Sequence, residues 1–512
     1  MEDKLEETIN EISKIAKGDD LKEIKNIIQN FDEAIASMKP ESIEDRSIAR
    51  ALARDISKKA FSLEKKYVPE IPENKKIADS VNCDTMIMTV GFQKEPIILS
   101  ITCMQPQRVI LLHTDGSRPV ALEVENDPAI KKRDIKITPL FITEYDASEN
   151  YRVIKDEALP RASENTVIDP TGGRKVMVAS LALVAFYLRH PMIYLHSIEK
   201  EGVVYPFTER LRFIENPFDY FGDAELSLVE EQFNSHLYEA AFKTCQQLGQ
   251  RVRHPTAHTK ITLLRDLIEV YCDWDGFLHS SVPEVKRPNP TLSEKLGKLI
   301  VDFCRLGFQN LLPDNIDANI TFLKSLDETW IDKRNISNEF RLIDIYASAL
   351  RRGSEEQKKY DDAVARLYRC LEMCSTIKLL QMGLKDTARP DYENLSSNIG
   401  IDVKKLGNSF RRRKHRKLPF ERLGLDDQMT LLEIIGDKIA SIYKSMRRHS
   451  KNADSLMEIR NRSILAHGTN PVTEDCWPKF RDKVEVIIKE TIGEKRYQEL
   501  INMAMHGDIH IV

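Results

Sequence analysis

The residues best suited to chemistry in this chain of 512 residues lie close together in the stretch Arg460–Gly468. An arginine can hold a phosphate through two hydrogen bonds, an amide can orient it, and a histidine can move a proton near neutral pH. Arg460, Asn461 and His467 therefore carry the groups that cleavage of a phosphodiester bond requires, and they are the candidate catalytic residues.

The spacing of these residues predicts a helix over residues 454–467. At about 100° per residue, Arg460, Ser463 and His467 fall on one helical face. Gly468 is a typical helix stop, which would leave His467 in the last turn, where the helix dipole favours the protonated ring. The alternative is an ordinary capped helix with a surface arginine and a C-terminal histidine.

A single copy of this stretch supplies only one histidine. Attack by a ribose 2′-hydroxyl and departure of the 5′-oxygen each need a proton transfer. A second copy across a two-fold axis would provide the missing group, so the sequence favours a homodimer.

Composition restricts the partners and the compartment. Charged residues make up 30% of the chain but the net charge is only −4, so binding to nucleic acid would depend on local basic patches. The densest basic patch is Arg411–Lys417. Its residues Arg411, Arg412 and Arg413 are candidate RNA-binding residues, and the alternative is a solvated loop without this role.

No apolar run could span a membrane and the acidic N-terminal region is unlike a signal peptide, so we expect a cytoplasmic protein.

Cysteine and histidine spacing gives no sign of a metal site. The eight cysteines are scattered without a CxxC pair, and we expect reduced, mostly buried thiols. His254/His258 and His506/His510 have the spacing of helical ligands, but Pro255 interrupts the first pair and the second lies in a terminal tail. We expect neither a metal nor a bound cofactor.

Between residues 85 and 196 the pattern predicts an α/β domain. Short, nearly continuous apolar runs alternate with helix-like segments, which is typical of a parallel sheet covered on both faces. The runs are residues 85–90, 108–113, 135–143, 166–169 and 192–196. In such sheets, ligands bind at the carboxyl ends of the strands.

Two loops at these strand ends could hold an anion. Residues 89–92 follow the first strand, and Asp169–Lys175 leads into a predicted helix. Gly172 and Gly173 would let the backbone approach a phosphate, and the last two residues of the loop add positive charge. The loop lacks Walker A and GxGxxG spacing, which disfavours an ATPase or a dinucleotide enzyme, and a plain connecting turn is the alternative.

The remaining regions are predicted to be helical. Residues 1–75 are predicted to form charged amphipathic helices. We favour a solvated accessory bundle for these helices, and the alternative is an element that docks or packs on another part of the protein. After Asn216–Pro217, helices are predicted at residues 226–252, 259–271, 292–311, 318–326 and 340–350. A helical bundle is predicted from residues 360–382, 426–446, 454–467 and 479–506.

These motifs together resemble a known family. The strand ending in Thr89-Val90-Gly91, the loop Asp169–Lys175, and Arg460-Asn461 with His467 resemble the CRISPR-associated CARF–HEPN ribonucleases of type III systems. In that family a Rossmann-like CARF domain binds cyclic oligoadenylate, and a HEPN dimer then cuts single-stranded RNA without a metal. The resemblance implies an α/β plus all-α fold and an allosterically activated endoribonuclease whose products end in 2′,3′-cyclic phosphates.

The resemblance also assigns roles to individual residues. Arg460, Asn461 and His467 would form the HEPN catalytic set. Cyclic tetra- or hexa-adenylate made by the type III effector complex would bind Gly91, Phe92, Thr171, Gly172, Gly173, Arg174 and Lys175. Arg174 replaces the smaller hydroxyl residue of many relatives, so ring size and cleavage of the activator by the CARF domain stay open. A non-catalytic nucleotide-sensing regulator with a degenerate HEPN bundle is the other alternative.

The expected organisation has four parts. Residues 1–75 are an N-terminal helical extension, 76–215 the CARF domain, 216–340 a helical connector and 341–512 the HEPN domain.

Overall fold

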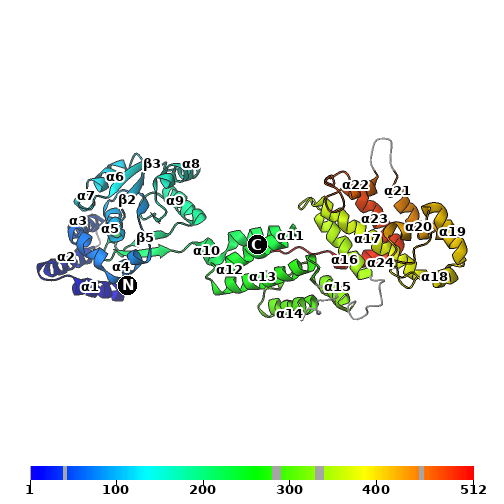
Figure 1. Cartoon of the computed structure of the whole chain (residues 1–512). Coiled ribbons are helices and arrows are strands. Elements are labelled where there is room, and N and C mark those ends of the chain that lie inside the picture. Colours follow the sequence, from blue (N-terminus) through cyan, green and yellow to red (C-terminus); the bar gives the residue numbers. More distant parts are fainter. Residues whose placement is uncertain (1, 39–42, 279–289, 329–338, 449–454, 512) are drawn as a thin grey trace. The chain divides into compact units, whose positions relative to one another are not determined.

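The computed structural model describes residues 2–38, 43–278, 290–328, 339–448 and 455–511. The chain divides into two compact units, Met1–Tyr220 and Phe221–Val512 (Figure 1). The first contains a sheet and the second is built from helices. The finer division into four parts remains a prediction. Within the described ranges, no helix is long and apolar enough to cross a membrane.

The first unit is organised around a six-stranded sheet in the order β3-β2-β1-β4-β5-β8. Its strands are β1 (Thr85–Thr89), β2 (Arg108–His113), β3 (Lys136–Phe141), β4 (Thr166–Asp169), β5 (Met192–His196) and β8 (Arg210–Ile214). The first five are parallel, as predicted, and β8 pairs antiparallel with β5. The apolar pattern does not predict β8, because two of its five residues are arginines. It also misses the short hairpin of β6 (Glu199–Lys200) and β7 (Val203–Val204).

Helices cover both faces of this sheet, as predicted. Met86 and Met88 of β1 belong to a core cluster with three helices that follow β1 and β2, whereas Ile87 belongs to a cluster on the other face. This alternation follows from the pleat of a strand. The helices of the first unit are α1 (Glu2–Ile15), α2 (Asp19–Ala36), α3 (Ile43–Tyr67), α4 (Pro72–Ser80), α5 (Glu95–Met104), α6 (Arg118–Glu125), α7 (Pro128–Lys132), α8 (Ala147–Val153) and α9 (Lys175–Leu188), and α10 (Pro217–Phe221) follows.

The N-terminal helices extend the core of the sheet. The buried ring of Phe31 in α2 packs edge-on against Tyr205, with 4.9 Å between centroids. Buried Asn74 of α4 donates to the Glu209 carbonyl at 3.1 Å and accepts from the Leu211 amide at 2.7 Å. The prediction of a solvated accessory bundle is therefore wrong, because the apolar stripes of these helices are buried against the sheet domain.

Two carboxyl groups are buried together where α3 meets the start of β8. Glu64 accepts a hydrogen bond from the Phe207 amide at 3.1 Å, whereas Oε2 of Glu209 has no partner among the described residues. Burial raises the pKa of Glu64 well above its ordinary value, and burial raises the pKa of Glu209 to about 7. The stability that protonated Glu209 contributes is therefore present below pH 4.5 and is lost as the pH rises through about 7.

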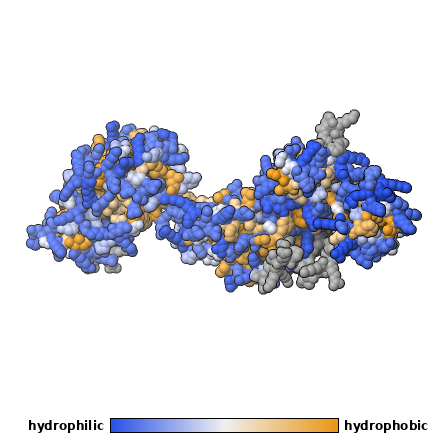
Figure 2. All heavy atoms as spheres, in the orientation of Figure 1, coloured by the Kyte–Doolittle hydropathy of each residue, from blue (hydrophilic) through white to orange (hydrophobic). Residues whose placement is uncertain are grey.

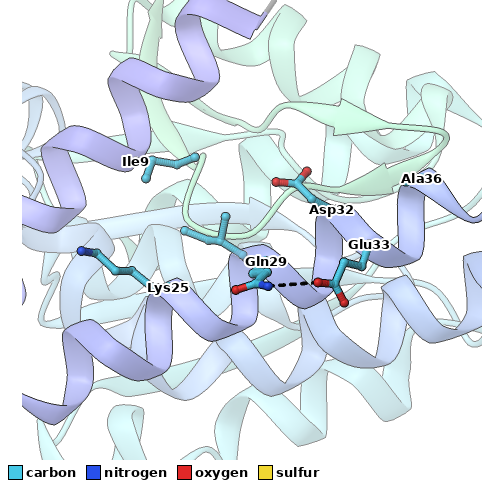
Figure 3. Close-up of a pocket in the computed structure, with 7 residues that line it drawn as sticks. Ile9, Lys25, Gln29, Asp32, Glu33 and Ala36 are labelled. Carbon is cyan, nitrogen blue, oxygen red and sulfur yellow. Dashed lines mark hydrogen bonds between the residues drawn. The ribbon is translucent and has the colours of Figure 1, made fainter.

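A hollow of about 510 Å³ lies between α1 and α2 (Figure 3). It is lined by Ile9, Lys25, Ile28, Gln29, Asp32, Glu33 and Ala36. Gln29 donates to Glu33 at 3.0 Å, and Asp32 accepts from the Tyr205 hydroxyl at 2.9 Å. Both carboxylates in the hollow are therefore bound by neighbouring side chains.

The second unit packs its helices around one continuous apolar cluster. The helices are α11 (Asp223–Asn234), α12 (Tyr238–Gly249), α13 (Pro255–Asp275), α14 (Leu292–Arg305), α15 (Ile316–Glu328), α16 (Glu339–Arg352), α17 (Tyr360–Gln381), α18 (Tyr392–Ile399), α19 (Val403–Lys414), α20 (Leu425–Ile435), α21 (Lys438–Met446), α22 (Leu456–Asn461), α23 (Trp477–Ile492) and α24 (Glu494–Ala504). The single helices predicted at 226–252, 426–446 and 479–506 are each two helices. The breaks fall at His236, Gly436 and Gly493, which adopt positive φ angles.

The segment after α24 packs back into this unit. The Ile509 amide donates to Asn234 Oδ1 at 2.9 Å, and the Asn234 side chain donates to the Ile509 carbonyl at 3.1 Å. His506 is buried with Nδ1 2.6 Å from the Tyr238 hydroxyl, and burial lowers the pKa of its imidazole well below the ordinary value. The expected terminal tail is therefore packed structure. Residues 506–511 are not helical and His510 is exposed, so the two histidines do not share a helical face.

Candidate functional site

The candidate catalytic stretch is a helix end followed by a tight loop. Helix α22 ends at Asn461, so the prediction of one helix through His467 is wrong. The following loop is closed by its own backbone hydrogen bonds, because Ser463 accepts from the Ala466 amide at 3.0 Å and the Gly468 amide at 3.1 Å. A Cβ atom on Gly468 would overlap the Arg462 backbone, so glycine is needed for this close approach.

The loop nevertheless brings the three predicted catalytic residues together. The His467 amide donates to the Asn461 carbonyl at 3.2 Å, and Nη1 of Arg460 donates to Asn461 Oδ1 at 3.0 Å. His467 and Asn461 are exposed, whereas Arg460 is half-buried. A turn thus holds the backbone of His467 at the end of the helix that carries Arg460, where the sequence predicts a shared helical face.

The ring of Tyr368 in α17 stacks against the guanidinium of Arg460. Its ring centroid lies 3.7 Å from Cζ of Arg460, which is close contact for a cation stacked on an aromatic face. Burial raises the pKa of Tyr368, Arg460 opposes this shift, and the charges of Glu372 and Asp426 add to it. The sequence gives no signal for this residue, because the contact joins two segments about ninety positions apart in the sequence.

The basic run Arg411–Lys417 begins on a helix, although a loop is its default interpretation from sequence. Its first four residues form the last turn of α19. Arg413 lies 3.7 Å from Glu433, Lys414 pairs with Asp426, and Arg416 lies 2.5 Å from Asp427. Arg411 and Arg412 are exposed and form no ion pair with any described residue. Only part of the run is therefore available to a polyanion.

The predicted nucleotide-binding residues converge at the carboxyl ends of β1 and β4. They line a cavity of about 310 Å³, at the point where the strand order reverses. The lining consists of Val90, Gly91, Phe92, Gln93, Pro96, Thr114, Ser117, Thr171, Gly172, Gly173, Arg174 and Met177. Six of the seven predicted residues are present. The seventh, Lys175, starts α9 and is not part of the lining.

Two glycines let the loops after β1 and β4 touch. A Cβ atom on Gly172 would lie 2.6 Å from the Thr89 carbonyl oxygen, and one on Gly91 would lie 2.9 Å from the Gly173 nitrogen. Such distances are shorter than any normal contact, so only glycine fits at these positions. The backbone of both loops is consequently available at the cavity wall.

Asp169, the last residue of β4, anchors the glycine loop. Its Oδ1 accepts from the Thr171 amide at 2.8 Å and from the Thr171 hydroxyl, and its Oδ2 accepts from Ser100. Burial raises the pKa of Asp169, and these hydrogen bonds oppose the shift. The Thr171 hydroxyl also accepts from the Leu195 amide at 2.9 Å. The hydroxyl is therefore engaged in holding the loop.

A third loop, which the sequence interpretation misses, completes the cavity. Thr114 and Ser117 follow β2, and the Thr114 amide donates to the Ser117 hydroxyl at 3.0 Å. The signal was available, because small polar residues directly follow a predicted strand adjacent to β1. Across the opening, Arg174 lies 2.7 Å from Glu144 and its guanidinium lies 5.8 Å from the exposed ring of Phe92. Glu144 therefore balances part of the positive charge expected from Arg174.

The chain combines an α/β domain, whose strand ends form a glycine-lined cavity, with a helical unit that presents an Arg-Asn-His set. Residues 332–490 match the family described as the Csm6 HEPN domain. This part of the chain is therefore similar to Csm6 HEPN domains, and the resemblance to CARF–HEPN proteins of CRISPR systems is confirmed. No curated protein sequence matches the chain.

Two solved structures are similar to the chain at low sequence identity. Enterococcus italicus Csm6 bound to cyclic hexa-2′-fluoro-hexa-dAMP is 11% identical, with a TM-score of 0.43, over 83% of this chain and 98% of that protein. Can2 from Sulfobacillus thermosulfidooxidans in complex with cyclic tetra-adenylate is 17% identical, with a TM-score of 0.21, over 51% of this chain and 67% of that protein.

Proposed function

We propose that the protein is an endoribonuclease that cyclic oligoadenylate activates to cut single-stranded RNA in type III CRISPR antiviral defence. The observation that carries this proposal is the catalytic loop, where an exposed histidine and a stacked arginine lie beside one asparagine inside the HEPN-matched region. A degenerate HEPN bundle would not need this arrangement, which disfavours the purely sensory alternative.

In the proposed mechanism, His467 transfers protons and Arg460 stabilises the negative charge that develops on the phosphorane. Asn461 orients Arg460 through the 3.0 Å hydrogen bond and positions the loop through its carbonyl. The ribose 2′-hydroxyl attacks the adjacent phosphate and the 5′-oxygen leaves. The products then carry a 2′,3′-cyclic phosphate and a 5′-hydroxyl, and side chains alone serve both proton transfers without a metal.

We propose that the active enzyme is a homodimer in which both copies contribute a histidine. The loop between Arg460 and His467 exposes two large aliphatic side chains, with 65% of Ile464 and 52% of Leu465 accessible to solvent. Apolar side chains beside a charged site are costly in water unless a partner covers them. A second copy of the loop would cover them and bring the second imidazole to the site.

The activator would bind the cavity of the first unit. Backbone amides of Gly91, Gly172 and Gly173, together with the start of α9, offer donors to ribose and phosphate groups. Phe92 offers a face to an adenine, and Arg174 and Lys175 offer charge. Binding of cyclic tetra- or hexa-adenylate would shift an equilibrium between inactive and active dimers, with residues 216–340 transmitting the change. Cleavage of the activator in this cavity is compatible with the same role.

Two further assignments follow from the proposal. Arg411 and Arg412 would attract RNA, whereas the ion pair of Arg413 with Glu433 reduces its contribution. A defence ribonuclease of this kind would act in the cytoplasm.

The test is RNA cleavage with cyclic tetra-adenylate and cyclic hexa-adenylate added separately, using wild type and His467→Ala. We expect one activator to accelerate wild-type cleavage, with no acceleration in the variant and no loss of rate in EDTA. The products should carry 2′,3′-cyclic phosphates. Products with 3′-hydroxyl ends, or cleavage by His467→Ala at the wild-type rate, would contradict the proposal.

A further inference from the structure

The segment after α19 turns back along that helix and is fixed at several points. His415 reverses the chain with a φ of 56°. Leu418 then packs on Gly407, so closely that a Cβ atom on the glycine would lie 3.3 Å from Leu418 Cδ1. The Tyr392 hydroxyl donates to the Pro419 carbonyl at 2.6 Å, and the Leu423 amide donates to the Thr387 carbonyl at 2.9 Å. The segment between these anchors cannot easily rearrange.

Phe420 lies between the last two anchors and points into solvent. Its side chain is 80% exposed, whereas Leu418 and Leu423 on either side are 9% and 2% exposed. Because the neighbouring anchors fix the segment, the ring cannot reach the core by a small movement. A phenylalanine held outward in this way presents its aromatic face to a partner.

Exposed cations lie on the face of α19 against which this segment packs and on the segment itself. Lys404, Gly407 and Arg411 follow each other at helical spacings of three and four, so the two cations flank the glycine on which Leu418 packs. Lys417 and Arg422 lie on the returning segment itself. All four cations are exposed and pair with no carboxylate among the described residues. Glu421 is the single acidic residue between His415 and Gly424.

The local charge differs from that of the whole chain. Residues 385–424 contain eleven lysines and arginines and five acidic residues, although the chain as a whole carries a net charge of −4. Figure 2 shows a predominantly hydrophilic surface at the end of the second unit that carries α19. Nearer the catalytic loop, Lys414 and Arg447 both bind Asp426 of α20, and α20 packs against α17, which carries Tyr368.

We propose that Phe420, Lys404, Arg411, Lys417 and Arg422 form a surface that holds single-stranded RNA outside the catalytic loop, and we call it the Phe420 surface. An unpaired base stacks on the phenylalanine ring, and the four cations bind the flanking phosphates. Exposed aromatic rings among unpaired cations are the arrangement with which proteins bind single strands irrespective of sequence. The assignment deepens the proposed function, since it rests on single-stranded RNA being the substrate.

The first test measures binding in the non-cleaving His467→Ala protein by fluorescence anisotropy, with a labelled oligouridylate of about 20 nucleotides. Phe420→Leu keeps an apolar side chain but removes the aromatic face, so we expect the Kd to rise at least about fivefold. Phe420→Tyr keeps the ring and should bind like the parent. Equal binding by the leucine and parent proteins would overturn the stacking role.

The second test examines the cations through the salt dependence of the same Kd. Replacing Lys404, Arg411 and Lys417 by glutamine should lower the slope of log Kd against log salt by up to about 2. Each phosphate that the protein no longer neutralises lowers this slope by about 0.7. The control replaces Lys243 and Lys298, exposed lysines of α12 and α14, by glutamine and should leave the slope unchanged. Equal slopes in both variants would overturn the assignment of these cations.

Cleavage kinetics separate this inference from the proposed function. In the activated wild-type background, Phe420→Leu should raise KM for a long RNA without changing kcat, and should leave cleavage of a tetranucleotide unchanged. If substitution of Phe420 and of the cations leaves cleavage of the long RNA unchanged, the RNA-binding role of the Phe420 surface is wrong, whereas the proposed ribonuclease function is not affected. RNA binding that depends on them in a protein that cuts no RNA would overturn the ribonuclease alone. Equal affinity of Phe420→Leu and parent for a double-stranded RNA is expected, because its bases cannot stack on the ring.

Discussion

Replacing Tyr368 by leucine should weaken catalysis through the arginine that stacks on it. The guanidinium carbon of Arg460 lies 3.7 Å from the centroid of the ring, and such contacts contribute about 0.5–2 kcal/mol, depending on how much water is excluded. Arg460 is half-buried, so we take about 1 kcal/mol, which corresponds to a fall of about fivefold in kcat/KM. Tyr368→Phe keeps the ring face and should stay within about twofold of wild type.

The assay is single-turnover cleavage of a labelled RNA at saturating activator, with thermal unfolding of each variant recorded alongside. A double-mutant cycle isolates the contact, because Tyr368→Leu should have no further effect once Arg460→Ala has removed the cation. A fivefold loss that persists in the Arg460→Ala background would refute the positioning role. Equal losses in Tyr368→Phe and Tyr368→Leu would also refute it, because the hydroxyl would then be the important group.

Two predictions concern the first unit. Gly172→Ala should weaken cyclic oligoadenylate binding at least about tenfold in calorimetry, because its Cβ would lie 2.6 Å from the Thr89 carbonyl oxygen, whereas Gly424→Ala, which has open space, should bind normally. Glu209→Gln should reduce the loss of stability that occurs as the pH rises from 4.5 through about 7, and the buried carboxyl of Glu64 accounts for the part that remains. Thermal unfolding at several pH values measures this change, and the exposed control Glu199→Gln should keep the wild-type pH profile. A wild-type pH profile for Glu209→Gln as well would contradict the buried-carboxyl argument.

The centre of the sheet could be predicted from the sequence because β1, β2 and β4 are buried on both faces and appear as continuous apolar runs. Strand β8 breaks this rule, since Arg210 and Arg212 are bound by Glu11 and Glu73 of the N-terminal helices. A local pattern cannot include such distant partners. For the same reason the sequence did not show that the N-terminal helices share the core of the sheet domain.

Some features of the candidate sites could be predicted from the sequence, and others could be seen only in the structure. The glycine loop after β4 follows from strand position and residue type, and it does line the cavity that the strand ends form. In the catalytic stretch the residue types were informative but the predicted conformation was wrong, because backbone hydrogen bonds to Ser463 and the close approach of Gly468 to Arg462 favour a turn over a continued helix. Tyr368 required the structure, since stacking between distant segments leaves no local pattern.

The central claim is that two copies of the catalytic loop together cut RNA when the activator is bound. The most direct measurement uses a purified heterodimer of one wild-type and one His467→Ala subunit, assayed with saturating activator beside both homodimers. The account predicts that the heterodimer is nearly as inactive as the His467→Ala homodimer, because each cut needs both imidazoles. A heterodimer with about half of the wild-type rate would show that each subunit cuts alone, and would contradict the account.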